Sequence, residues 1–347
     1  MLRHAIARIL FAIVASASAG AAQQSGAQTS AAAAAPSFAS AQEFAARGRL
    51  DKALTQLNEL AAQSPEPAGV ERLRGIIFYQ REQFRDAVEA FSKAEIQDPN
   101  DRESVEMLGV SLYRLGRGAE AIPYLEKAHA AVERANIDPN YVLAICYADA
   151  QRYDDSRHAF AAQYGFPPDS AQAYLLAGRM FLRRELRDQA GAQATKALEL
   201  DASLPLAHEL LGEVALAGGD LPGAIHEFEA ERKIDPLNPD LYDRLGDAYL
   251  RSGDYTSAQI ALDRAVLLEP NSTGPYILLG ETFLKLNQPI EALHYLVRAA
   301  QMDPSNYITH NLLAQAYKAT GQPDEANREF RIAVNLQNNG ASSARER

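Results

Sequence analysis

The chain of 347 residues contains no tryptophan and only one cysteine, Cys146. A single cysteine excludes an intrachain disulfide and a cysteine zinc cluster, and its ordinary place is in a core as a small apolar residue. Basic residues are also scarce, because 34 Lys and Arg face 45 Asp and Glu, which gives a net charge of −11. Nucleic acid and anionic lipid repel such a chain, so we expect no nucleic-acid partner.

Catalytic motifs are missing as well. The seven histidines never form His-Glu-x-x-His, and the chain has no glycine-rich phosphate loop and no Gly-x-Ser-x-Gly turn. His208 and His310 occupy equivalent positions among packing residues, which favours a role in the core over metal binding. We therefore expect no enzymatic activity, no cofactor and no metal site.

Long apolar runs are confined to the N-terminus. Residues 1–22 combine basic residues, the apolar run "ILFAIVASA" and the small residues Ala17 and Ala19. This order is typical of a signal peptide, cleaved near Ala19 or Ala22. It predicts a bacterial protein that is periplasmic or secreted, without a stable membrane span after cleavage. The alternative is an uncleaved anchor in the inner membrane. Residues 23–37 resemble a flexible low-complexity linker, and residues 341–347 a disordered tail.

The dominant positive feature is a period of 34 residues. Stretches that begin Leu-Gly-Glu or Leu-Gly-Asp end at Pro236, Pro270 and Pro304. One position holds Ala or Ser in every copy: Ala53, Ala87, Ala121, Ser156, Ala190, Ala224, Ala258, Ala292 and Ala326. Nine copies follow, with one inserted residue near 136: 34–67, 68–101, 102–136, 137–170, 171–204, 205–238, 239–272, 273–306 and 307–340.

Each copy has the pattern of two helices. In the copy 239–272, apolar residues recur at helical spacing on both sides of Gly253. Gly253 can end the first helix in a left-handed conformation, and Asp254 can cap the second. Gly246 and Ala258 leave room for the two helices to approach closely, so a larger residue there would overpack the contact.

These residues resemble the tetratricopeptide repeat family. Its motif appears as Leu245-Gly246-x-x-Tyr249, then Ala326-x-x-x-Phe330-x-x-Ala333, then a closing proline such as Pro270. The resemblance implies an all-α solenoid of helical hairpins over residues 38–340, wound as a right-handed superhelix. It also implies a concave groove, lined by the first helices, that binds peptides or protein segments without catalysis.

Three places depart from the pattern. The first copy has a weak first helix, "PSFASAQEFAARG", which suggests a frayed terminal repeat. The fourth copy diverges most. In the sixth copy Glu231 replaces the usual alanine, and a buried unpaired carboxylate is costly. We therefore expect Glu231 to rotate outward or to pair with Arg232 or Lys233.

The groove positions change character along the chain. The predicted binding residues form an apolar and aromatic half, Ile76, Tyr79, Val110, Tyr113, Tyr141 and Ile145. They continue into an acidic half, Glu209, Glu213, Asp243, Asp247 and Glu281. An apolar strip beside charge often marks a binding site, and the acids would attract a protein or peptide with basic residues.

Two alternatives remain at this point. The acids could be an ordinary solvated face, neutralised in part by Arg244, Arg251 and Lys285. The protein could also be an accessory component of envelope assembly, polysaccharide export or secretion, with Tyr79, Tyr113 and Tyr141 contacting glycan or a pore.

Overall fold

The computed structural model describes residues 36–129 and 139–345, and every regular element in these ranges is an α-helix. The predicted signal peptide, most of the linker and the insertion near 136 lie outside the described residues. Contacts divide the chain into two units, one ending at Pro168 and the other beginning at Asp169. The division falls at the end of the divergent fourth copy.

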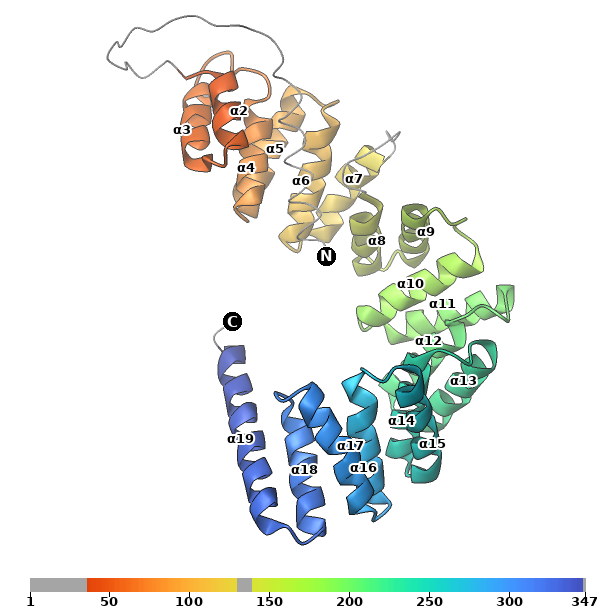
Figure 1. The fold of residues 1–347 in the computed structure, drawn as a ribbon. Coiled ribbons are helices and arrows are strands. Elements are labelled where there is room, and N and C mark those ends of the chain that lie inside the picture. The colour runs from red at the N-terminus through yellow and green to blue at the C-terminus, as the bar shows by residue number, and fades with distance from the viewer. Residues whose placement is uncertain (1–35, 130–138, 346–347) are drawn as a thin grey trace, which may run out of the picture. The chain divides into compact units, whose positions relative to one another are not determined.

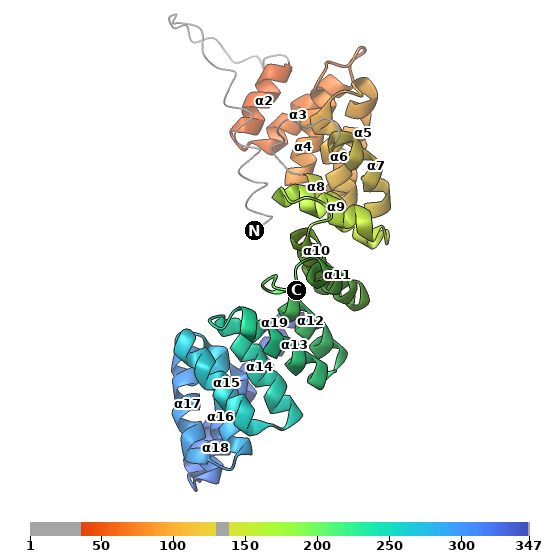
Figure 2. The same ribbon diagram turned by 90° about the vertical axis from the view of Figure 1, so that its right-hand side faces the viewer.

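The first unit consists of helical hairpins that follow one another along the chain (Figures 1 and 2). Its helices are α2 (Phe38–Ala46), α3 (Leu50–Ala61), α4 (Val70–Gln80), α5 (Phe84–Gln97), α6 (Arg102–Arg114), α7 (Gly118–His129), α8 (Pro139–Asp149) and α9 (Tyr153–Tyr164). The weak first helix of copy one is formed as α2, because the Ser37 side chain accepts a hydrogen bond from the Ser40 amide. Cys146 is buried, as expected.

The second unit repeats the same hairpin five times (Figure 1). Its helices are α10 (Ala171–Arg183), α11 (Arg187–Leu200), α12 (Ala207–Gly218), α13 (Leu221–Ile234), α14 (Pro239–Ser252), α15 (Tyr255–Leu268), α16 (Thr273–Lys285), α17 (Pro289–Met302), α18 (Tyr307–Ala319) and α19 (Pro323–Arg345). The last helix continues through residues 341–345, which the sequence assigned to the tail. Each first helix packs on its own second helix, and α12, α14, α16 and α18 also pack on the second helix before them.

The predicted joint between α14 and α15 is confirmed. Gly253 ends α14 with φ of 86°, a left-handed conformation that costs glycine little. The Asp254 side chain accepts a hydrogen bond from the Ser257 amide at 3.1 Å, which caps α15. The lowered pKa of Asp254 has the same cause, because bonds from Ser257 favour the charged carboxylate.

In six of the nine first helices a glycine forms a packing notch: Gly75, Gly109, Gly178, Gly212, Gly246 and Gly280. A methyl group added to Gly75 would lie 2.6 Å from the Phe91 ring, and one added to Gly246 would overlap the Leu262 side chain. Phe91 and Leu262 are fully buried in this contact. The missing side chain of the glycine is therefore what lets the two helices of a hairpin pack this closely.

This notch yields a stability prediction. We expect Gly246→Val to lower the free energy of unfolding by about 1–3 kcal/mol, because the valine must displace Leu262 from a packed core. Gly218, also helical, has no atom near enough to meet an added methyl group, so Gly218→Val is the matched control. Urea unfolding of both variants tests the prediction, and equal losses of stability would contradict it.

Candidate functional site

The six predicted apolar and aromatic residues lie on α4, α6 and α8. Tyr79, Val110 and Ile145 are buried, and the other three are half-buried. Two of the rings pack within their own hairpins: Tyr79 lies edge-on to Phe84 at 5.4 Å, and Tyr141 lies 5.7 Å from Phe160. These residues therefore contribute to the hairpin cores as well as to the first-helix face.

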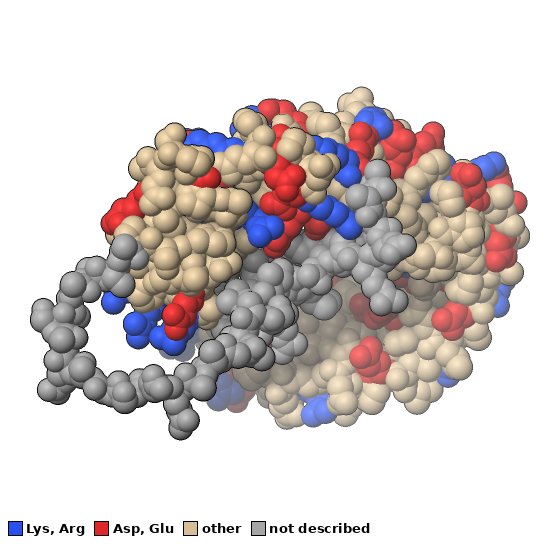
Figure 3. Space-filling view, turned by 90° about the horizontal axis from the view of Figure 1, so that it is seen from above, with Lys and Arg blue, Asp and Glu red and all other residues tan. Residues whose placement is uncertain are grey.

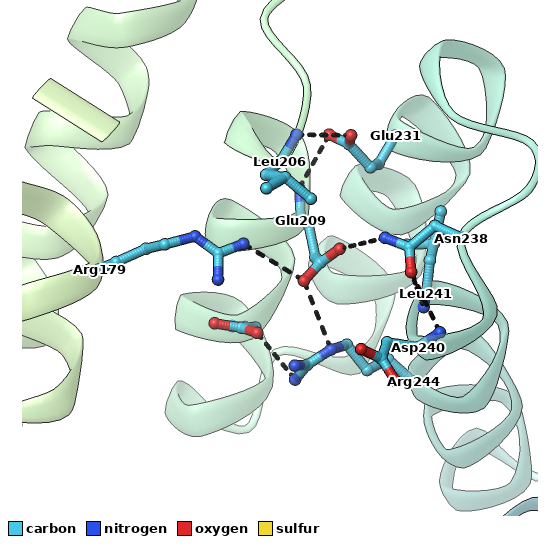
Figure 4. A network of polar contacts seen from close by, with 9 residues as sticks. Arg179, Leu206, Glu209, Glu231, Asn238, Asp240, Leu241 and Arg244 are labelled. Atoms are coloured by element: carbon cyan, nitrogen blue, oxygen red, sulfur yellow. Dashed lines mark hydrogen bonds and ion pairs between the residues drawn. The ribbon is translucent and has the colours of Figure 1, made fainter. Parts of the chain in front are cut away.

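The five predicted acids lie on α12, α14 and α16, and two of them form a network (Figure 4). Glu209 is only 3% exposed. One carboxylate oxygen of Glu209 lies 3.4 Å from the Arg179 guanidinium and 3.7 Å from that of Arg244, and the other accepts a hydrogen bond from Asn238 at 2.9 Å. The network thus ties α10, α12 and α14 together across three successive copies.

Arg244 also holds the second acid of α12. Its guanidinium lies 2.8 Å from the Glu213 carboxylate. Burial raises the pKa of Glu213, and the charge of Arg244 opposes that rise. Arg244 therefore balances charge on Glu209 and Glu213, as expected for this arginine, but Glu209 is buried and does not belong to a solvated face.

Glu231 corrects one prediction. It does not rotate outward or pair with Arg232 or Lys233; it is fully buried on α13. Its two carboxylate oxygens accept hydrogen bonds from the amides of Leu206, at 2.6 Å, and Glu209, at 3.3 Å (Figure 4).

Glu231 is therefore the N-terminal cap of α12, supplied by the next helix. The α12 helix begins after Leu206, whose side chain cannot cap it, and a carboxylate satisfies the free amides and suits the helix dipole. The signal in the sequence was the absence of Ser, Thr, Asp or Asn at position 206. Arg232 pairs with Glu229 instead.

The remaining acids, Asp243, Asp247 and Glu281, form what we call the acidic strip. They lie on the first helices α14 and α16, which contact each other. Asp247 lies 3.5 Å from Arg251, and Glu281 is half-buried with no ion pair among the described residues. The strip thus carries three carboxylates against one close arginine.

Asp243 is the most perturbed member of the strip. Its Oδ1 atom is enclosed and has no hydrogen-bond partner within the described part of the chain. Burial first, and then the negative charges of Asp247 and Asp240, raise the pKa of Asp243 to about 6. On the neighbouring helix, Gly274 has no side chain to cover the carboxylate, so nothing from that residue closes the site.

Within residues 36–129 and 139–345, no group of three His, Cys, Asp or Glu could hold a metal ion. In the same ranges no helix has the length and apolar character needed to cross a membrane. Figure 3 shows acidic and basic side chains interspersed over the face that it displays.

Matches to models of protein families show which family the chain belongs to. Three models, each described as tetratricopeptide repeat, match residues 38–101, 72–135 and 185–239, then 239–272, and then 283–341. The chain belongs to the tetratricopeptide repeat family. The matches leave out residues 1–37, 136–184, 273–282 and 342–347. Tetratricopeptide repeats support a role as a protein-interaction scaffold, and proteins of this kind are typically not enzymes.

Solved structures share the repeat at low identity. YrrB, described as a tetratricopeptide protein with an unusual peptide-binding site, is 23% identical, with a TM-score of 0.47, over 52% of this chain and 93% of YrrB. MamA from Desulfovibrio magneticus RS-1 is 21% identical, with a TM-score of 0.47, over 49% of this chain and 97% of MamA. A chain of the APC/C hetero-tetramer Cut9–Hcn1 is 18% identical, with a TM-score of 0.43, over 80% of this chain and 54% of that chain. Curated proteins gave no significant match.

The pKa of Asp243 yields a second prediction. Because the folded state raises this pKa from 3.8 to about 6, folding favours the neutral acid, and stability falls as pH rises between these values. Asp243→Asn should therefore unfold like the parent near pH 4 and gain about 1–2 kcal/mol above pH 7, a value reduced for solvent screening. Chemical denaturation across this pH range measures the difference, and a difference independent of pH would contradict the cause.

Proposed function

We propose that the protein is a non-enzymatic scaffold that binds a basic segment of a partner protein along the acidic strip. The observation that carries the proposal is Asp243, a half-buried carboxylate with an enclosed oxygen that has no hydrogen-bond partner among the described residues. Its position is unfavourable for the isolated protein, because burial and two neighbouring acids oppose its charge. A cation from a partner would remove that penalty.

The three acids of the strip suit a lysine or arginine chain of defined spacing. Asp243 and Asp247 are one helical turn apart on α14, so a single cation can lie between their carboxylates. Glu281 lies on the next first helix, and packed helices are roughly 8–10 Å apart. An extended chain advances about 3.3 Å per residue, so basic residues about three positions apart would reach both helices.

Two further features support a basic partner. The net charge of −11 favours association with cationic molecules over anionic ones. The arginines of the neighbouring network already form ion pairs, because Arg179 contacts Glu209 and Arg244 contacts Glu213. The charge of Arg244 also acts on Asp243, but less than burial, Asp247 and Asp240 do.

We further propose that the scaffold acts outside the cytoplasm of a bacterium, in the periplasm or after secretion. The support is the order of basic, apolar and small residues in the segment 1–22.

Removal of the strip tests the binding proposal. The triple variant Asp243→Asn, Asp247→Asn and Glu281→Gln should bind a lysine–alanine decapeptide about tenfold more weakly than the parent, because three charge contacts are lost. The triple variant should also show a smaller dependence of affinity on salt. Isothermal titration calorimetry at several salt concentrations measures both quantities.

The control removes equal charge elsewhere. Glu199, Glu269 and Glu291 are exposed and lie outside the strip. Their replacement by glutamine leaves the same net charge as the strip variant, so general attraction of the peptide to an acidic protein affects both equally. If the two triple variants lose the same affinity, the acidic strip is not the binding site.

A further inference from the structure

An open cavity of about 580 Å³ lies between α13, α14 and α15. Its floor is formed by the buried residues Tyr242, Leu245 and Ala261. Ile260 and Leu267 stand at its edge and are 68% and 70% exposed. None of the residues of the acidic strip lines it.

One of the residues that line the cavity, Ala261, is small. Within the second unit, the position of Ala261 holds a larger side chain in each of the other four copies: Gln193, Glu227, Tyr295 and Glu329. Glu227 and Glu329 fill it by contacting the imidazoles of His208 and His310, each at 2.7 Å. Among the five copies of the second unit, only copy 239–272 has a methyl group there, whereas Ala90 and Ala159 hold this position in two copies of the first unit.

The next copy shows what this space is shaped to hold. The Tyr295 ring stacks on Phe283 with centroids 5.3 Å apart and planes 12° apart, and it lies 6.3 Å from the Tyr276 ring. Its hydroxyl donates to Asp263 at 3.4 Å. An aromatic ring with a phenolic hydroxyl is therefore a proven occupant of this position in this chain.

The surroundings of Tyr295 recur around Ala261 without the ring itself. Tyr242, Tyr249 and Glu229 stand 34 residues before Tyr276, Phe283 and Asp263 respectively. All three line the cavity. The two aromatic contacts are thus in place, while no tyrosine stands at the position of Tyr295 and the carboxylate of Glu229 already has partners of its own.

The charge available in the cavity is positive. Glu229 already accepts hydrogen bonds from Tyr249, at 3.0 Å, and from Arg232. Asp263 accepts from Tyr295. The Arg264 guanidinium lies 6.0 Å from the centre of the Tyr242 ring and forms no ion pair within residues 139–345.

We propose that this cavity is a second binding site, which takes a tyrosine side chain of a partner protein with an acidic residue beside it. The ring occupies the space that Tyr295 fills in the next copy and packs on Tyr242 and Tyr249. The neighbouring carboxylate pairs with Arg264. This site is separate from the acidic strip and prefers the opposite charge, so either can fail without the other.

Small mimics of the occupant test the site directly. The probes are para-hydroxyphenylacetate, para-cresol and tyramine, which share a phenol ring and carry negative, zero and positive charge. Amide shifts in NMR spectra of the full chain report binding, and we expect them in residues 255–268 and around Tyr242. We expect affinity to fall in the order para-hydroxyphenylacetate, para-cresol, tyramine.

Two variants separate the ring from the charge. Ala261→Tyr supplies the residue of the next copy, so it should fold with an unchanged or higher melting temperature and lose more than about tenfold in affinity for every probe. Arg264→Gln should weaken para-hydroxyphenylacetate about threefold and leave para-cresol unchanged, because the ion pair is partly exposed. Arg298→Gln, the same position one copy later, is the control and should leave all affinities unchanged.

The proposal is overturned if no probe shifts these amides, if Ala261→Tyr folds and still binds them, or if tyramine binds as well as para-hydroxyphenylacetate. If Ala261→Tyr does not fold, the affinities of the three probes for Arg264→Gln still test the proposal. Sedimentation of the full chain tests whether a second copy of the same protein occupies the cavity. Self-association that Ala261→Tyr abolishes would show that it does, and would contradict the proposal of a different partner.

Discussion

The close approach of two helices at a residue without a side chain is the constraint on which the structure depends. At Gly246 any added carbon would overlap Leu262, and the same relation holds at Gly75 with Phe91. Six first helices have a glycine at this notch, and the other three have alanine, so every hairpin keeps a small residue there and its positions recur with the period of 34 residues. A residue that differs between copies at an equivalent position therefore changes the surface of one hairpin without changing its fold.

One helix, α14, contributes to both candidate surfaces. A turn of 100° per residue places Asp243 and Asp247 on one side of the helix and Tyr242, Leu245 and Tyr249 on nearly the opposite side. The first side carries carboxylates and the second carries rings beside an arginine. A partner with separate basic and acidic aromatic segments could therefore engage α14 from two directions.

The sequence predicted what depends on local chemistry and on the period. Gly253 and Asp254 behave as cap residues because their roles need only neighbours in the chain. Glu231 was misjudged because its partners, the amides of Leu206 and Glu209, lie in the preceding hairpin. Neither a helical period nor a capping motif reveals a cap that comes from another helix.

The same reason limits what the sequence could say of the acids. The predicted acidic half included Glu209 and Glu213, yet Arg244 of the next copy contacts both. Asp243 differs from them because, within the described ranges, no such side chain reaches its enclosed oxygen. Which acid is left without a partner depends on rotamers and burial across copies, and it became visible only in three dimensions.

The most direct test of the account is the proton exchange that accompanies binding at the acidic strip. Calorimetry of the lysine–alanine decapeptide near pH 6, in two buffers with different ionisation enthalpies, should show proton release, because a cation favours the charged form of Asp243. The release should vanish in Asp243→Asn. Binding heats that do not depend on the buffer in the parent protein would contradict the account.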